Sequence, residues 1–403
     1  MKRPARTPLP PGFGTIWVTV ALDLIGFGIV FPILPIYAHR FGADAVSATG
    51  MVAAFSAAQL VFAPVWGRLS DRVGRKPVLI VSLVGTAVGS LVTGLAGSVA
   101  ILYLGRVLDG ISGGSVSVAQ AAVADIAPAD QRARLLGLVG AAFGVGFVAG
   151  PALGALSALG GPRVPFLVAA VIAAANALVA SRRLPETRPA AEAPHVKRPI
   201  FDRQAWQAER VLPFVVLAFL SLSAFSAFEA TFPFFGEVRL HFGEVSTAAT
   251  FAAIGLPLLV VQARLIGPAV DRLGERTVLV AGLACNAVGL FLLAGVHSVL
   301  ALVAPMALLV VGQGLASPTL SSIVAGRAGA HRRGAVLGVQ QAAGGFARVV
   351  GPIAGGLLFK HLGVPAPYLT GGTVMVAAAL LAAVISADAR TPFGRSGTVV
   401  TDQ

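Results

Sequence analysis

Five charged side chains lie inside long apolar stretches, where a charge is costly and is usually kept for function. They are Asp23, Arg106, Asp109, Glu229 and Arg348. In an apolar environment a carboxyl group can hold a proton near neutral pH, and a nearby arginine favours its release. A cavity that contained both groups could exchange a proton for a substrate by competition.

Structural roles are the alternative for some of these residues. Arg106 and Asp109 are three residues apart, so they could equally form a static pair within one helix. Arg348 could bind backbone carbonyls near the following Gly-Pro step. Asp23 and Glu229 have no basic neighbour on their own segments, which favours substrate or proton binding for at least one of them. Gln340 could line a polar cavity or hold helices together.

A glycine-rich, charged loop is the most specific pattern in the sequence, and we call it the first gate motif. Its glycines permit a tight turn, its aspartate can face a helix N-terminus, and its basic residues can anchor a cytoplasmic surface. It contains Gly67, Asp71, Arg72, Gly74, Arg75 and Lys76. A second gate motif recurs two hundred residues later as Gly267, Asp271, Arg272 and Gly274, with Glu275 in the place of Arg75. A plain basic loop would not explain why the aspartate and both glycines recur.

A second glycine pattern spaces small residues about one helical turn apart, which allows close contact between membrane helices. It consists of Gly146, Gly150, Pro151 and Gly154. Pro151 removes a backbone hydrogen bond and is expected to bend its helix. The Gly-Pro pair recurs at Gly351-Pro352, followed by Gly355.

The segments that must position these residues are membrane helices. The 403 residues are 56% hydrophobic and 12% charged, about half the usual ~25% charged. Residues 45–67, 77–105, 135–162 and 277–326 contain no Asp, Glu, Lys or Arg, and each is long enough to cross a bilayer at ~20 residues per helix. Hydropathy predicts twelve spans: 14–37, 47–66, 77–97, 99–123, 134–158, 164–182, 212–236, 246–267, 277–296, 299–325, 334–359 and 366–386.

The internal repeat predicts an all-α polytopic membrane protein whose twelve transmembrane helices form two pseudo-symmetric six-helix bundles. The bundles are expected over residues 1–184 and 212–386, with a cytoplasmic linker at 185–211 and a cytoplasmic tail at 387–403. Parallel repeats of this size are typical of transporters that bind substrate between their halves.

Basic residues fall mainly at the N-terminus and in every second loop, and the other loops hold only Arg40, Arg163, Arg239 and Lys360. The positive-inside rule therefore predicts that both termini are cytoplasmic. The net charge of +13 is spread over these loops, which argues against nucleic acid as a partner. The bilayer, protons and a small hydrophobic substrate are the expected partners.

The sequence gives no sign of a cofactor. The single cysteine, Cys285, excludes an intramolecular disulfide and a cysteine-based metal cluster. The phosphate-binding pattern of ATPases is absent, so the proton gradient is the expected energy source. No nucleophile, histidine or metal-ligand cluster lies at membrane depth, which argues against a membrane enzyme.

Taken together, these motifs resemble the major facilitator superfamily, and within it the twelve-helix drug:proton antiporters related to bacterial tetracycline efflux pumps. The resemblance is carried by the two glycine motifs and by three other stretches: Leu22-Asp23-x2-Gly26 through Pro32-x2-Pro35, Tyr103-Leu-Gly-Arg106-x3-Gly110-Ile-Ser-Gly113 through Ala124-Asp125, and Pro165-Phe166. The Gly146–Gly154 pattern resembles the antiporter motif of this family, and we use that name for it below. It implies proton-coupled export of drug-like compounds by alternating access, by a monomer in the bacterial cytoplasmic membrane.

The resemblance also implies roles for individual residues. Asp71 would cap a helix of the second half in the outward-facing state, while Arg75 and Asp125 would form a charge relay at the cytoplasmic gate. Asp23 would lie on the proton or substrate path, and Arg106 would be linked to proton coupling.

This sequence departs from the pattern of the tetracycline pumps at three positions: Asp109 replaces a small residue, Ala155 replaces a glycine, and Glu275 reverses a charge. Asp109 and Glu229 could favour cationic substrates. Transport of a metabolite or lipid-like compound by the same fold, and a non-transporting membrane scaffold, are the alternatives.

Overall fold

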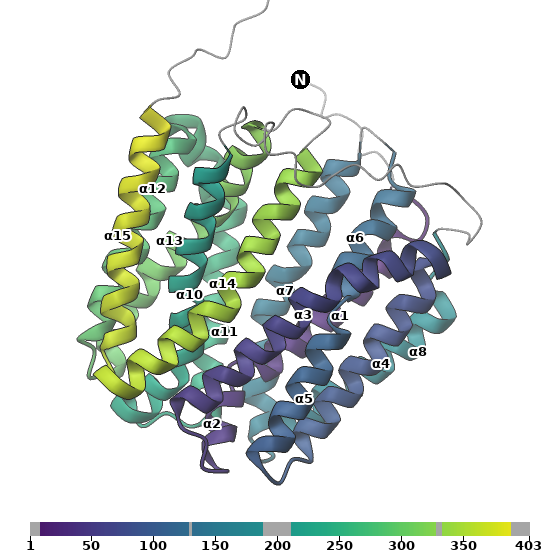
Figure 1. Ribbon diagram of the computed structural model, residues 1–403, viewed down its shortest axis with the longest axis horizontal. Coiled ribbons are helices and arrows are strands. Elements are labelled where there is room, and N and C mark those ends of the chain that lie inside the picture. Colours follow the sequence, from purple (N-terminus) through teal and green to yellow (C-terminus); the bar gives the residue numbers. More distant parts are fainter. Residues whose placement is uncertain (1–8, 129–130, 188–210, 328–332, 388–403) are drawn as a thin grey trace, which may run out of the picture.

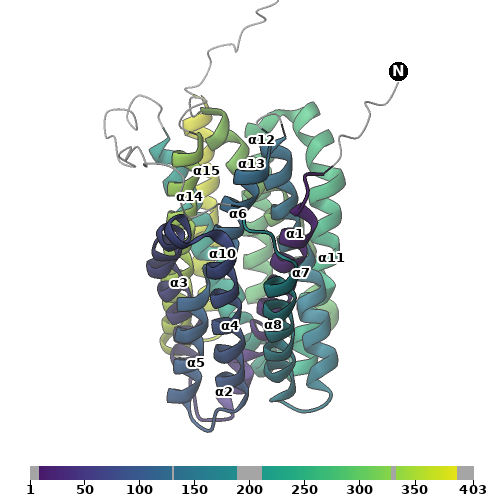
Figure 2. The ribbon, with the colours of Figure 1, turned by 90° about the vertical axis from the view of Figure 1, so that its right-hand side faces the viewer.

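The computed structural model describes residues 9–128, 131–187, 211–327 and 333–387, and this part of the chain is helical without strands. The first half contains α1 (Phe13–Val30), α2 (Leu34–His39), α3 (Ala45–Val73), α4 (Arg75–Gly94), α5 (Val99–Ser112), α6 (Ser115–Ile126), α7 (Arg132–Ala158) and α8 (Val164–Arg183). The second half contains α10 (Leu212–Leu240), α11 (Glu244–Val260), the π-helical segment η1 (Val261–Leu265), α12 (Ile266–Ala294), α13 (Val299–Arg327), α14 (Arg333–Leu362) and α15 (Ala366–Ala387). The two halves lie side by side, and their helices run lengthwise between two ends (Figures 1 and 2).

Eleven helical stretches of the described chain are long and apolar enough to cross a membrane, rather than the twelve predicted spans. The difference lies at 246–267 and 277–296, which join into one stretch of 51 residues, Glu244–Ala294. That length is enough for two crossings at ~20 residues each. All-α polytopic architecture is therefore confirmed, with α11, η1 and α12 taking the place of two separate predicted spans.

Equivalent glycines set the turns of the two gate motifs. Gly74 separates α3 from α4 with φ 100° and ψ 160°, and Gly274 interrupts α12 with φ 79° and ψ 153°. Both conformations lie at positive φ, which glycine adopts without the steric penalty of a Cβ. The two halves therefore turn in the same way at matching positions.

Two predicted helices are broken. The first span, predicted over 14–37, ends as α1 at Val30 and resumes as the short helix α2 at Leu34. Pro32 lies at the break and cannot supply a backbone N–H donor to a continuing helix, whereas Pro35 lies in the first turn of α2, where no such donor is needed. The span predicted over 99–123 divides into α5 and α6 around Gly113 and Gly114. By contrast, α7 runs through Pro151 as one helix.

The apolar core follows the division into halves. One large cluster lies within the second half and includes Phe214, Leu290 and Met375, while another lies within the first half around Leu79 and Val139. A third cluster is shared, because it packs first-half residues near α2 against Phe234 and Ala248 of the second half. We call the end of the bundle that carries α2 (Figure 1) the α2 end, and the opposite end, where Gly74 turns, the gate-motif end.

Candidate functional site

The first gate motif is built around Arg75, whose side chain is buried at 5% exposure. Its guanidinium donates to Asp71 Oδ1 at 2.8 Å, to Asp125 Oδ2 at 2.9 Å and to Ser70 Oγ at 2.6 Å. These partners lie on α3 and α6, whereas Arg75 is the first residue of α4. One guanidinium therefore ties three helices together at the gate-motif end, since its donors match carboxylate acceptors in fixed geometry.

A residue that the sequence analysis did not single out completes this motif. The Glu186 carboxylate accepts from the backbone N–H of Arg75 at 2.8 Å and from that of Lys76 at 3.0 Å. These N–H groups open α4, where a negative charge is favoured by the helix dipole. Glu186 lies in the expected linker. The one sequence feature that could have singled it out is its position just after Arg182 and Arg183, the basic end of α8.

The other residues of the first gate motif lie in different surroundings. Gly74 permits the turn, and a Cβ there would lie 2.5 Å from Glu186 Oε2. Gly67 faces open space, because nothing lies within 4 Å of a Cβ built on it. Arg72 and Lys76 lie on the outer surface of the turn.

Arg106 and Asp109 form an ion pair of 3.0 Å on α5, and both side chains are buried, at 3% and 8% exposure. Arg106 also donates to Thr93 Oγ1 of α4 at 3.3 Å. Its Nε has no hydrogen-bond partner among the described residues. Gly89 of α4 and Gly105 of α5 allow the two helices to pack closely beside this ion pair, because a Cβ on Gly89 would lie 2.9 Å from the Gly105 carbonyl oxygen.

Asp23 of α1 faces the same region. Its Oδ2 accepts a hydrogen bond of 2.5 Å from Ser115 Oγ, at the first turn of α6. Asp23 also lies within electrostatic range of Asp109. The structure thus brings together Asp23 of the predicted span 14–37 with Arg106 and Asp109 of the predicted span 99–123, within one half.

The second half has its own charged pair at membrane depth. Glu229 on α10 and Arg348 on α14 interact electrostatically across the contact between these helices. Gln340, two turns earlier on α14, donates to Ser321 Oγ of α13 at 3.1 Å, while its Oε1 has no partner in the described chain. Gln340 therefore links helices, and its unpaired oxygen leaves room for a further polar contact.

The antiporter motif packs α7 directly against α1. A Cβ on Gly150 would lie 2.6 Å from the Gly28 Cα, and a Cβ on Gly146 would lie 2.9 Å from the Leu24 carbonyl oxygen. Gly154 continues this contact at Ile29. Pro151 lies within the same face, since its Cδ would be 3.3 Å from a Cβ on Gly28. The glycines therefore serve close contact with the helix that carries Asp23.

The repeated motif on α14 packs in the same way against α10 of its own half. A Cβ on Gly355 would lie 3.1 Å from the Ala227 Cβ. Each of these helices also touches the opposite half: α7 contacts α11, and α14 contacts α3. The two glycine-rich helices therefore line the contact between the halves.

Three polar contacts between described residues join the halves at the α2 end, and no motif in the sequence predicts them. Arg40 Nε donates to Glu244 Oε1 at 2.7 Å, and Lys360 Nζ donates to Asp44 Oδ2 at 2.7 Å. His39 Nδ1 contacts Glu237 Oε1 at 2.9 Å. We call these three pairs the α2-end clasp. Arg40 and Lys360 of the clasp are two of the four basic residues that lie in the loops predicted on the non-cytoplasmic side.

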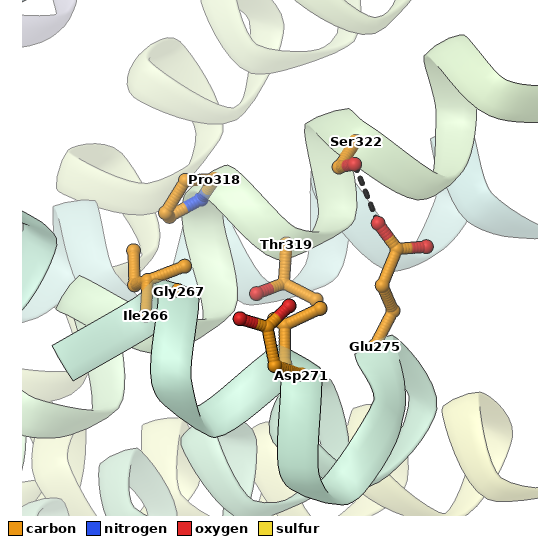
Figure 3. Close-up of a pocket in the computed structure, with 8 residues that line it drawn as sticks. Ile266, Gly267, Asp271, Glu275, Pro318, Thr319 and Ser322 are labelled. Carbon is orange, nitrogen blue, oxygen red and sulfur yellow. Dashed lines mark hydrogen bonds between the residues drawn. The ribbon is translucent and has the colours of Figure 1, made fainter. Parts of the chain in front are cut away.

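The second gate motif differs from the first in its charges. Asp271 and Glu275 lie beside each other on α12, and Glu275 Oε1 accepts from Ser322 Oγ of α13 at 2.5 Å (Figure 3). A cavity lies beside these two carboxylates, and Gly267 forms part of its lining. Arg272 is exposed. The carboxylates and histidines of the described chain do not gather into groups of three or more that could hold a metal ion.

A family model and curated relatives match this architecture. The model of the Major Facilitator Superfamily matches residues 16–266 and 263–398. The class E tetracycline resistance protein of Escherichia coli is 32% identical over 351 residues, which cover 85% of this chain and 86% of that protein. Multidrug resistance protein 2 of Bacillus subtilis (strain 168) is 29% identical over 364 residues, covering 89% of this chain and 90% of that one.

Solved structures share the fold. The crystal structure of the human organic anion transporter MFSD10 matches with a TM-score of 0.70 and 25% identity, and covers 93% of this chain and 100% of that chain. A POT family transporter in complex with 5-aminolevulinic acid matches with a TM-score of 0.80 and 15% identity, covering 95% of this chain and 97% of that chain.

Proposed function

Because this chain belongs to the major facilitator superfamily, we propose that it exports hydrophobic, drug-like compounds in exchange for protons by alternating access. Its relatives are transporters, and the chain is a transporter rather than an enzyme. Tetracycline resistance and multidrug resistance proteins are among the relatives, which supports a drug-like substrate and a bacterial inner membrane.

The observation that carries the proposal is the cluster formed by Asp23, Arg106 and Asp109. Two carboxyl groups and one arginine lie close together at membrane depth, although one arginine can neutralise only one carboxylate. Burial of the second negative charge is costly unless it takes up a proton. The cluster can therefore gain and lose a proton, and Asp23, which has no arginine partner among the described residues, is the better candidate for the site of exchange.

The proton and substrate steps also require that the two ends open alternately. We assign the gate-motif end to the cytoplasm, because the basic residues of the loops concentrate there. The α2 end then faces outward, where the clasp and the shared apolar cluster join the halves. This arrangement supports a state in which the outer end is closed. Both termini are cytoplasmic in this assignment, and the chain acts as a monomer without a cofactor.

Expression in an efflux-deficient bacterial host tests the proposal. We expect reduced susceptibility to several hydrophobic drugs, and drug uptake into everted membrane vesicles that an uncoupler abolishes. Uptake that is unaffected by the uncoupler would contradict proton coupling. A metabolite or lipid-like substrate would replace the drug assignment if no drug in the panel were transported while such a compound moved protons in the same vesicles.

Loss of the clasp should favour opening of the α2 end. Exposed ion pairs contribute ~0–1 kcal/mol each, so Arg40→Gln combined with Lys360→Gln should shift the equilibrium between states by up to about thirtyfold. Spin labels on cysteines introduced at Gly97 and Gly295, in a Cys285→Ser background, would report the separation of the halves. Both glycines are exposed turns at this end, one in each half. We expect a larger population of long distances.

Arg163→Gln provides the matched control, because Arg163 lies at the same end but interacts with Tyr37 of its own half. An equal change in this variant would contradict the role of the clasp in closing the α2 end.

The Lys360 ammonium and the Ser47 backbone N–H hold the pKa of Asp44 below its ordinary value. This pair is therefore retained above the ordinary pKa of ~3.9 and is lost only as the pH falls below it.

A further inference from the structure

The two gate motifs share their backbone turn but not their charges. In the first motif, the Arg75 guanidinium fills the space between Asp71, Ser70 and Asp125. In the second, Glu275 takes the position of Arg75, so Asp271 has a carboxylate one turn away instead of an arginine. The repeats are offset by 200 or 201 residues, so the residue of the second half that corresponds to Asp125 is Ala325 or Gly326, and neither carries a charge. The second motif therefore lacks the internal cation that organises the first.

A cavity of about 200 Å³ lies at this place, between α12 and α13. Asp271 and Glu275 line one side of it, and Thr319 and Ser322 line the other (Figure 3). Ile266, Gly267, Val270 and Pro318 form the rest of the wall. The cavity is larger than the ~30 Å³ share of one water molecule, so a small organic group fits it.

Thr319 gives an independent indication of a ligand. Its side chain is 2% exposed, and its hydroxyl has no hydrogen-bond partner in the described chain. Three other buried helical threonines, Thr49, Thr93 and Thr231, donate to the carbonyl four residues earlier, whereas Thr319 and Thr247 have no such bond among the described residues. In Figure 3 the Thr319 hydroxyl points toward the Asp271 carboxylate. A buried polar group is costly when it has no partner.

We propose that this cavity binds a small organic cation of the guanidinium type from the cytoplasm, in the position that the Arg75 side chain occupies in the other half. The bound cation would donate hydrogen bonds to the Asp271 and Glu275 carboxylates and to the Thr319 hydroxyl. It would thereby tie α12 to α13, as Arg75 ties α4 to α3 and α6.

The chemistry of the lining favours an organic cation over a metal ion. Ca²⁺ takes six to eight oxygen ligands, and Mg²⁺ requires near-octahedral oxygen coordination, whereas half of this lining is apolar. A planar guanidinium can present its N–H donors to carboxylates along its edge and place its faces against apolar groups. Hydrogen bonds from such a cation to carboxylates are also stronger than neutral ones.

Methylguanidinium is the probe for this site, with tetramethylammonium as a cation that lacks N–H donors. We expect the purified full-length protein in detergent to bind methylguanidinium in titration calorimetry and to show a higher apparent Tm in its presence. Tetramethylammonium should give no such shift. Absence of methylguanidinium binding, or an equal response to both cations, would overturn the proposal.

Two variants locate the site. Glu275→Arg restores the pattern of the first motif, so the new arginine should fill the cavity, abolish methylguanidinium binding and keep or raise the apparent Tm without ligand. Thr319→Val should weaken binding about tenfold, whereas Thr250→Val, at a half-buried threonine bonded within α11, should leave it unchanged. The assignment would be overturned if folded Glu275→Arg protein, or Thr319→Val protein, bound methylguanidinium with the affinity of the wild type. Because binding is measured without transport, the result is independent of the proposed drug export.

Discussion

Replacement of Asp23 by asparagine should abolish proton-driven drug transport without unfolding the protein. Asparagine has nearly the same volume as aspartate and can still accept a hydrogen bond from Ser115, which lies 2.5 Å from the carboxylate. It cannot gain or lose a proton, so exchange of proton for substrate at this position stops. We expect uptake into everted vesicles to fall to the level seen with an uncoupler, while the apparent Tm stays close to that of the wild type.

Three companion measurements make this prediction specific. Asp23→Glu keeps a titratable carboxyl group and should retain part of the activity, while Ser115→Ala removes only the hydrogen bond and should reduce transport without abolishing it. Exchange of labelled for unlabelled drug, which needs no net proton movement, should persist in Asp23→Asn. Unchanged proton-driven uptake in this variant would remove Asp23 from the coupling mechanism and leave Asp109 or Glu229 as the alternative.

A side chain at Gly150 should strongly destabilise the protein and eliminate transport. A Cβ there would lie 2.6 Å from the Gly28 Cα and 2.8 Å from the Ile25 carbonyl oxygen. Both obstacles belong to the α1 backbone, so a change of rotamer cannot relieve the clash. Overpacking commonly costs ~1–3 kcal/mol, and we expect Gly150→Val to reach at least the upper end of that range. Thermal unfolding in detergent and uptake in vesicles would both report the change.

The same helix supplies the control. Nothing lies within 4 Å of a Cβ built on Gly140, so Gly140→Val should leave the apparent Tm and transport near wild-type values. Similar losses in the two variants would mean that valine harms α7 through its helix propensity rather than through the contact with α1. A difference confined to Gly150 would support tight α1–α7 packing as the function of the antiporter motif.

The sequence predicted the membrane helices well, because a span needs a long apolar stretch and the bilayer fixes its length. It was less accurate where local backbone geometry decides the outcome. The first span was predicted as one stretch over 14–37, yet the chain divides there into α1 and α2 around Pro32. The predicted spans 246–267 and 277–296 are joined through η1 and the first part of α12, since the polar loop between them is itself helical on both sides of Gly274.

Composition and motif spacing alone were enough to determine a polytopic helical protein with an internal repeat and to single out a few charges within the membrane. Pairing between distant residues was decided only by the tertiary structure. Arg75 meets Asp125 and Glu186, Asp23 meets Ser115, and the halves are joined at the α2 end by side chains far apart in the chain. The reason is physical: hydropathy depends on each stretch by itself, whereas hydrogen bonds and ion pairs require atoms within about 3 Å, and only the packing of helices brings them there.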